Sequence, residues 1–143
     1  MSYPAGKMLA MASTTRHLGE RIARSAADVY AYVADPAHLP LWSSGLGSGI
    51  AQVDGEWLID SPEGKLRFAF VPANEFGVLD HEVTFPSGET FYNPMRVVPY
   101  DDGAEVVFSV RRFGDISDSD FDRDTAAVAA DLAKLREVLE AAA

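Results

Sequence analysis

His81 is the side chain of this sequence best suited to chemistry. An imidazole titrates near neutral pH and can donate, accept or transfer a proton. Residues 77–85 alternate between apolar and polar types, and His81 shares the apolar face with Leu79, Val83 and Phe85. We therefore expect an inward-facing histidine, which is either a working group in a pocket or a core histidine bonded to a backbone carbonyl.

The opposite face of the same stretch is the wetter one. It holds Val78, Asp80, Glu82 and Thr84. Asp80 directly precedes His81, and the two would form an acid–base dyad if they met. Neighbouring residues on a strand point to opposite faces, so we expect no dyad unless a bulge intervenes.

Glu20 and Asn93 are the other polar candidates at inward positions. Glu20 lies between two apolar residues of its face, where an unpaired carboxylate would be costly to bury. The alternative is a bulge or strand end that leaves it in water. Asn93 also takes an inward position, whereas Arg96 takes an outward one and is expected to be solvated or ion-paired. Pro94 can disturb both assignments.

Large apolar side chains supply the remaining candidates for a pocket. The alternation places five of them inward, and most are expected to be core: Trp57, Phe68, Phe70, Met95 and Phe108.

Composition excludes several other kinds of site. The chain has no cysteine and only three histidines, scattered at 17, 38 and 81, so we expect no metal site and no cofactor. It has no glycine-rich phosphate loop and no nucleophile elbow. The net charge of −10 argues against nucleic acid or an anionic membrane surface as the main partner. No apolar run approaches a membrane span of about 20 residues. The lack of cysteine fits a reducing interior, and we expect a cytoplasmic protein.

The last stretch, from Ser117 to Ala143, is expected to position these groups. Ser117 and Asp120 suit the start of a helix. One helical face carries a stripe: Phe121, Thr125, Val128, Leu132, Leu135 and Leu139. The stripe predicts docking on the body of the chain, and a coiled-coil seam in a homodimer is the alternative.

Strands dominate the body before that helix. Residues 14–23 alternate as a first strand, and two short helices follow between Ser25 and Trp42. Tight turns then predict a run of strands: Ile50–Val53, Glu56–Asp60, Leu66–Val71, Phe76–Phe85, Glu89–Val98 and Ala104–Phe113. This order predicts an α+β fold in one domain, residues 14–143, after a flexible tail of residues 1–13. A strongly curved sheet leaves room for a cavity near one end of the helix.

The sequence resembles the START-like, helix-grip proteins of the polyketide cyclase/dehydrase and lipid-transport (SRPBCC) superfamily. The resemblance rests on VYAYVADPAHLPLW at 29–42, FGVLDHEVTFPSGE at 76–89, YNPMRVVP at 92–99 and the closing helix. It covers about residues 14–141 and is strongest to a bacterial polyketide-cyclase-like branch. It implies a Bet v 1-like fold, with a seven-stranded curved antiparallel sheet around the long C-terminal helix. It also puts Trp42 near the cavity mouth, where it contacts ligand or simply packs.

The resemblance implies three functions. The first is a carrier or sensor that binds a small, largely apolar or amphipathic molecule between sheet and helix, with Leu132 and the inward side chains as lining. The second is a polyketide cyclase/dehydratase-like enzyme with His81 in proton transfer, aided by Glu20 or Asn93. The third is a co-chaperone-like interaction module with a filled core. One scaffold serves all three, so the fold alone does not choose between them.

Overall fold

The structure is a computed structural model and describes residues 14–44 and 49–142. Within them the chain forms eight strands, three α-helices and one 3₁₀ turn. In order these are β1 (Thr15–Ile22), α2 (Ala26–Val33), η1 (Pro36–His38), α3 (Leu39–Trp42), β2 (Ile50–Val53), β3 (Glu56–Ser61), β4 (Gly64–Phe70), β5 (His81–Thr84), β6 (Thr90–Asn93), β7 (Met95–Tyr100), β8 (Gly103–Arg111) and α4 (Asp118–Ala141).

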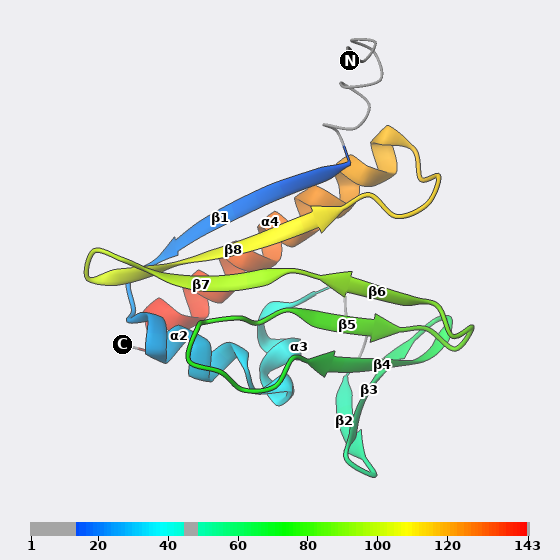
Figure 1. Ribbon diagram of the computed structural model, residues 1–143, viewed down its shortest axis with the longest axis horizontal. Helices are drawn as coiled ribbons and strands as arrows, with labels where there is room; N and C mark the ends of the chain where they lie inside the picture. Colours follow the sequence, from blue (N-terminus) through cyan, green and yellow to red (C-terminus); the bar gives the residue numbers. More distant parts are fainter. Residues whose placement is uncertain (1–13, 45–48, 143) are drawn as a thin grey trace, which may run out of the picture.

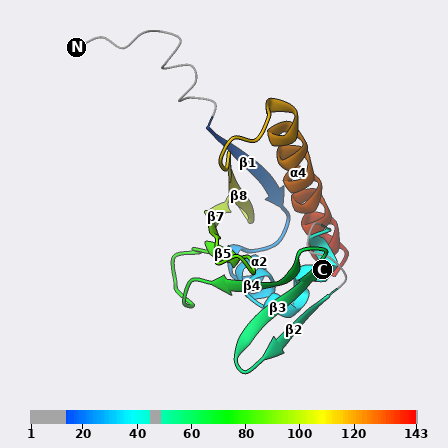
Figure 2. The ribbon, with the colours of Figure 1, turned by 90° about the vertical axis from the view of Figure 1, so that its right-hand side faces the viewer.

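The long C-terminal helix docks on its own chain. Ser117 caps α4 by accepting a hydrogen bond from the Asp120 amide at 3.1 Å. The helix packs on β1, β8 and α3, and Figure 2 shows it along one side of the curved strands. Four residues of the predicted stripe are buried, and Thr125 and Val128 are half-buried: Phe121, Leu132, Leu135 and Leu139. The α+β fold with a helix held by a curved sheet is therefore confirmed.

Two local predictions from turn and cap residues are also confirmed. Ser25 accepts a hydrogen bond from the Asp28 amide at the start of α2. Asp54 and Gly55 turn the β2–β3 hairpin with φ angles of +51° and +82°. Positive φ at both central residues is the requirement of a type I′ turn.

The strands form two antiparallel sheets, whereas the sequence analysis expected one sheet of seven strands. One sheet has the order β1-β8-β7 and the other β2-β3-β4-β5-β6. Pro94 is the physical reason, because it lacks the N–H that a continuous ladder needs and splits the predicted strand Glu89–Val98 into β6 and β7. These two strands still follow each other in one line (Figure 1). The Pro94 carbonyl accepts a hydrogen bond from the Ser109 amide of β8 at 3.0 Å.

The predicted strand Phe76–Phe85 is only partly correct. Its second half forms β5, but the first half follows a turn organised by the side chain of Asn74. The Asn74 Oδ1 accepts hydrogen bonds from the amides of Phe76 and Val78, at 3.0 and 3.1 Å. Gly77 has φ +71°, and a Cβ there would lie 2.2 Å from the Val97 carbonyl oxygen. Only glycine fits this close approach of the turn to β7.

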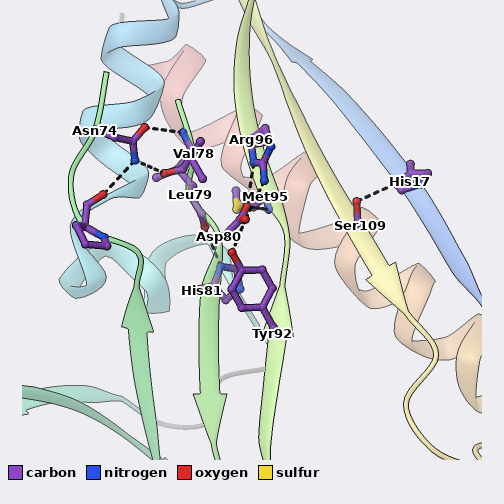
Figure 3. Close-up of polar contacts among 11 residues, drawn as sticks. His17, Asn74, Val78, Leu79, Asp80, His81, Tyr92, Met95, Arg96 and Ser109 are labelled. Carbon is purple, nitrogen blue, oxygen red and sulfur yellow. Dashed lines mark hydrogen bonds and ion pairs between the residues drawn. The ribbon is translucent and has the colours of Figure 1, made fainter. Parts of the chain in front are cut away.

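Asp80 lies at the bend between the two sheets on the predicted outer face, but it is buried there, which corrects the expectation that it is wet. Its Oδ1 accepts from the Met95 amide at 2.8 Å and from Arg96 Nε at 3.0 Å. Its Oδ2 accepts from the Tyr92 hydroxyl at 2.6 Å and from Arg96 Nη2 at 2.9 Å (Figure 3). One carboxylate on the chain leading into β5 thus fastens both β6 and β7. Arg96 is ion-paired and exposed, as predicted.

The charge of Asp80 is stabilised by these contacts. Burial alone would raise the pKa of Asp80, but hydrogen bonds from Arg96, Tyr92 and the Met95 amide outweigh burial. They lower the pKa from 3.8 to about 2. The ionised network is therefore intact throughout the physiological range of pH.

We expect the Asp80→Ala variant to unfold more easily, by about 2–3 kcal/mol in the free energy of unfolding. The variant loses the four hydrogen bonds, and its Met95 amide is left without an acceptor in an apolar interior. The expected loss of stability lies at the lower end of the range for buried ion pairs because Arg96 is half exposed and regains water. Urea unfolding followed by circular dichroism measures the difference. Glu82→Ala, on the exposed side of β5, is the control, with an expected change below about 0.5 kcal/mol. Equal stability of the two variants would contradict the role of Asp80.

Candidate functional site

A cavity of about 140 Å³ lies between the concave side of the sheet and the helices α3 and α4. We call it the inner chamber. It is lined by side chains from β4 to β8 and from both helices: Leu39, Trp42, Ser43, Phe68, Phe70, His81, Val83, Asn93, Met95, Phe108, Val128, Asp131 and Leu132. Apolar cavities of about 150 Å³ hold a benzene molecule. The inner chamber is therefore large enough for one small ring.

A wider outer groove adjoins the inner chamber. Its volume is about 600 Å³, and it lies between the β2–β3 hairpin, strands β4 and β5, and the end of α2. Phe68 and Phe70 line both hollows, so their rings form part of the wall between them. Trp57 lines the groove together with three charged residues, Glu56, Arg67 and Glu82. The groove is thus more polar than the chamber.

His81 occupies an aromatic box inside the chamber. Its ring stacks on Phe68 at 5.0 Å, meets Phe70 edge-on at 5.5 Å and lies 5.7 Å from the ring of Phe108. The imidazole is only 7% exposed. Its Nδ1 lies 3.0 Å from the carbonyl oxygen of Leu79, to which it donates when protonated (Figure 3). The sequence analysis offered a working pocket group or a core histidine bonded to a carbonyl as alternatives. The side chain of His81 both bonds the Leu79 carbonyl and lines the cavity.

The surroundings of His81 favour its neutral form. Burial lowers the pKa of His81 below its ordinary 6.5, and the Leu79 carbonyl and the Asp80 charge oppose this effect without reversing it. Since Nδ1 carries the proton that the carbonyl accepts, Nε2 has the free lone pair. Among the described residues, nothing donates a hydrogen bond to Nε2. The chamber wall thus presents one hydrogen-bond acceptor in an apolar setting.

Asn93 supplies the second polar group of this wall. It pairs with His81 across β5 and β6, on the same inner face. Directly opposite residues have Cβ atoms about 4.5–5.5 Å apart. The Asn93 side chain makes no hydrogen bond within the described parts of the chain, although it lines the chamber. An amide can both donate and accept, so this cross-strand pair offers both kinds of partner.

Asp131 on α4 closes the helical side of the chamber, and the sequence analysis missed it. Its carboxylate accepts from the Ser44 amide at 3.1 Å, the Ser44 hydroxyl at 2.9 Å and the Ser43 hydroxyl at 3.3 Å. These bonds tie the end of α3 to α4. Trp42 packs here with its indole Nε1 buried and without an acceptor in the described chain.

The structure brings together eight of the ten residues that the sequence analysis named as ligand-binding. Trp42, Phe68, Phe70, His81, Asn93, Met95, Phe108 and Leu132 line the inner chamber. Trp57 lines the outer groove, and Glu20 lies half-buried on β1 opposite Val106 and lines neither hollow. Five chamber residues were not among those named as ligand-binding: Leu39, Ser43, Val83, Val128 and Asp131. Val83 and Val128 share a face with residues that were named, but no pattern in the sequence around Asp131 indicates that it lines a cavity.

The other two histidines lie apart from His81. His17 on β1 pairs with the Ser109 hydroxyl at 2.8 Å on the exposed face (Figure 3). His38 stacks on Tyr32 with ring centres 4.1 Å apart. Across the described ranges, no three histidine or acidic side chains are grouped as metal ligands would be. None of the helices in those ranges has the length and apolar character to cross a membrane.

Comparison with solved structures identifies the fold. The chain is similar to DynU16, a protein of the dynemicin biosynthetic locus, with a TM-score of 0.66 and 13% identity over 90% of this chain and 48% of that one. It is similar to Ara h 8.0201, with a TM-score of 0.62 and 14% identity over 89% and 97% of the two chains. It is also similar to the Aha1 dimer from Colwellia psychrerythraea, with a TM-score of 0.67 and 14% identity over 88% of this chain and 96% of that one. No known family model and no curated protein matches the sequence. The chain has the START-like, SRPBCC fold.

We expect the ring protons of His81 to titrate below pH 6.5 in an NMR experiment, since burial lowers the pKa of this group. In the interval between the folded and unfolded pKa values the unfolded chain binds more protons. The free energy of unfolding therefore falls as the pH drops below about 6.5, and His81→Gln removes this contribution. A His81 titration at or above pH 6.5 would contradict the buried, neutral state.

Proposed function

We propose that this protein binds a small, largely apolar molecule in the inner chamber, as a carrier or sensor. The observation that supports the proposal is the chamber itself, a hollow beneath α4 whose wall is mostly apolar. Protein interiors are otherwise close-packed, and an unfilled cavity costs stability. An interaction module with a filled core would not need such a space.

Electrostatics favour a neutral guest. The charged side chain of the chamber wall is Asp131, whose carboxylate is already engaged by Ser43 and Ser44. A negatively charged guest would face this carboxylate and a chain of net charge −10. A positively charged guest would lose its hydration on entering a mostly apolar chamber, and the Asp131 carboxylate is already engaged by Ser43 and Ser44. Apolar burial, at about 25 cal/mol per Å², is then the main source of affinity.

The outer groove provides room for a longer guest. It shares Phe68 and Phe70 with the chamber, so a guest seated in the chamber would reach the groove only if these two side chains moved aside. The groove's charged residues suit a polar end that stays near water. Native mass spectrometry of freshly purified protein, followed by extraction, would identify a guest acquired in the cell.

We expect Val128→Phe to weaken the binding of fluorobenzene at least tenfold, because the new phenyl ring on α4 fills the chamber. Fluorine NMR of fluorobenzene, titrated with wild type and variant, measures the affinity. Val138→Phe is the matched control, since Val138 is also half-buried on α4 but does not line the chamber. Equal binding by wild type and Val128→Phe, or no binding by either, would overturn the proposal.

A second candidate is catalysis by proton transfer, as in a polyketide cyclase/dehydratase-like enzyme. The neutral imidazole, its tautomer fixed by the Leu79 carbonyl and its Nε2 free, is the observation that favours it. Such a nitrogen can remove a proton from a bound guest. With an identified guest, His81→Ala would keep binding and lose turnover if this candidate is correct. Unchanged turnover in that variant would exclude His81 from catalysis.

A further inference from the structure

The polar side chains that the sheet contributes to the chamber wall lie next to each other. Phe70, His81 and Asn93 lie side by side across β4, β5 and β6. The sheet positions on either side of this row are apolar, with Phe68 and Val83 on one side and Met95 on the other. A guest therefore meets one polar pair on the sheet side of the chamber, across from Ser43, Asp131 and the indole of Trp42 on the helical side.

His81 and Asn93 offer different hydrogen-bonding groups to a guest. His81 offers a lone pair at Nε2, because its Nδ1 is bonded to the Leu79 carbonyl. Asn93 offers an amide that makes no hydrogen bond with any described residue. A guest that gives both groups a hydrogen-bond partner makes contacts that an apolar guest does not make, so it is favoured.

We propose that the preferred guest of the inner chamber is a neutral, single-ring molecule that carries a hydroxyl group, which donates to His81 Nε2 and accepts from the Asn93 amide. This inference rests on the proposed function and narrows its ligand class. A hydroxyl is one of the few small groups that donates and accepts at once. The ring takes the remaining volume, which matches that of a benzene-sized cavity.

A carboxylate is the wrong group for this pair. It cannot donate to Nε2, and Asp131 lies in the same wall. Burial also keeps the imidazole neutral by lowering the pKa of His81, so no positive charge compensates an anion. A ring without a polar group would fit the volume but leave both wall groups unpaired.

Three probes of similar size test the inference: phenol, fluorobenzene and benzoate. We expect phenol to bind about tenfold more tightly than fluorobenzene in calorimetric or NMR titrations near pH 7, and benzoate to show no binding. In Asn93→Leu the preference for phenol over fluorobenzene should fall by about threefold, because the hydroxyl loses the Asn93 amide but keeps His81 Nε2 as its acceptor. Fluorobenzene binding by the variant verifies that its chamber is intact. Thr90→Val, on the exposed side of β6, is the control and should keep the preference.

The outcomes separate this inference from the proposal on which it rests. If phenol and fluorobenzene bind equally to the wild type, or if Asn93→Leu keeps the preference, the hydroxyl class is overturned while the chamber remains a binding site. Benzoate binding more tightly than phenol also overturns it. If none of the three probes binds, the proposed function itself fails.

Discussion

The buried carboxylate of Asp80 is the constraint on which the rest of the structure depends. It lies where the sheet changes partners at Pro94, and its two oxygens accept four hydrogen bonds from Tyr92, Met95 and Arg96. Next to Pro94 the backbone of residues 77–79 pairs with β7. The side chain of Asp80 supplies the acceptor for the Met95 amide, which the backbone does not provide. On one side of this point β7 continues into the sheet whose strands β8 and β1 lie along α4, and on the other side β5 to β2 curve away (Figure 2).

The chamber is a consequence of that arrangement. Successive residues of a strand point to opposite faces, so Asp80 and Tyr92 meet on the outer side while His81 and Asn93 face the inside. The hydrogen bonds of Asp80 on the outer face thus fix how β5 and β6 are aligned, and with them the positions of His81 and Asn93. Precise placement of a binding group usually comes from such supporting contacts rather than from the group itself. The residue next to His81 in the sequence therefore acts on the site from the opposite face, as a positioning residue and not as a catalytic partner.

Sequence reasoning reached the fold and much of the site because local rules and tertiary packing agree there. The α4 stripe, the caps at Ser25 and Ser117 and the Asp54-Gly55 turn each follow from a short pattern. Alternation placed His81, Phe68 and Phe70 on the chamber side. It failed at Asp80, because burial there comes from hydrogen bonds to residues 12 to 16 positions later.

Side-chain hydrogen bonds, one set local and one long-range, explain the other differences. The turn made by Asn74 removed half of a predicted strand, since four hydrogen bonds of one amide outweighed the β propensity of residues 76–80. Asp131 looked like a solvent-facing helix residue, and only its contacts with Ser43 and Ser44 reveal its place at the chamber. A single sequence does not report which distant groups will meet.

The central claim is that α4 and the curved sheet enclose an apolar space open to a guest, and a crystal exposed to pressurised xenon tests it most directly. Xenon occupies dry apolar cavities without needing a specific chemical partner. We expect xenon density between Phe68, Phe108 and Leu132, with α4 in place on the sheet. A crystal in which these side chains fill the space and no xenon enters would contradict it.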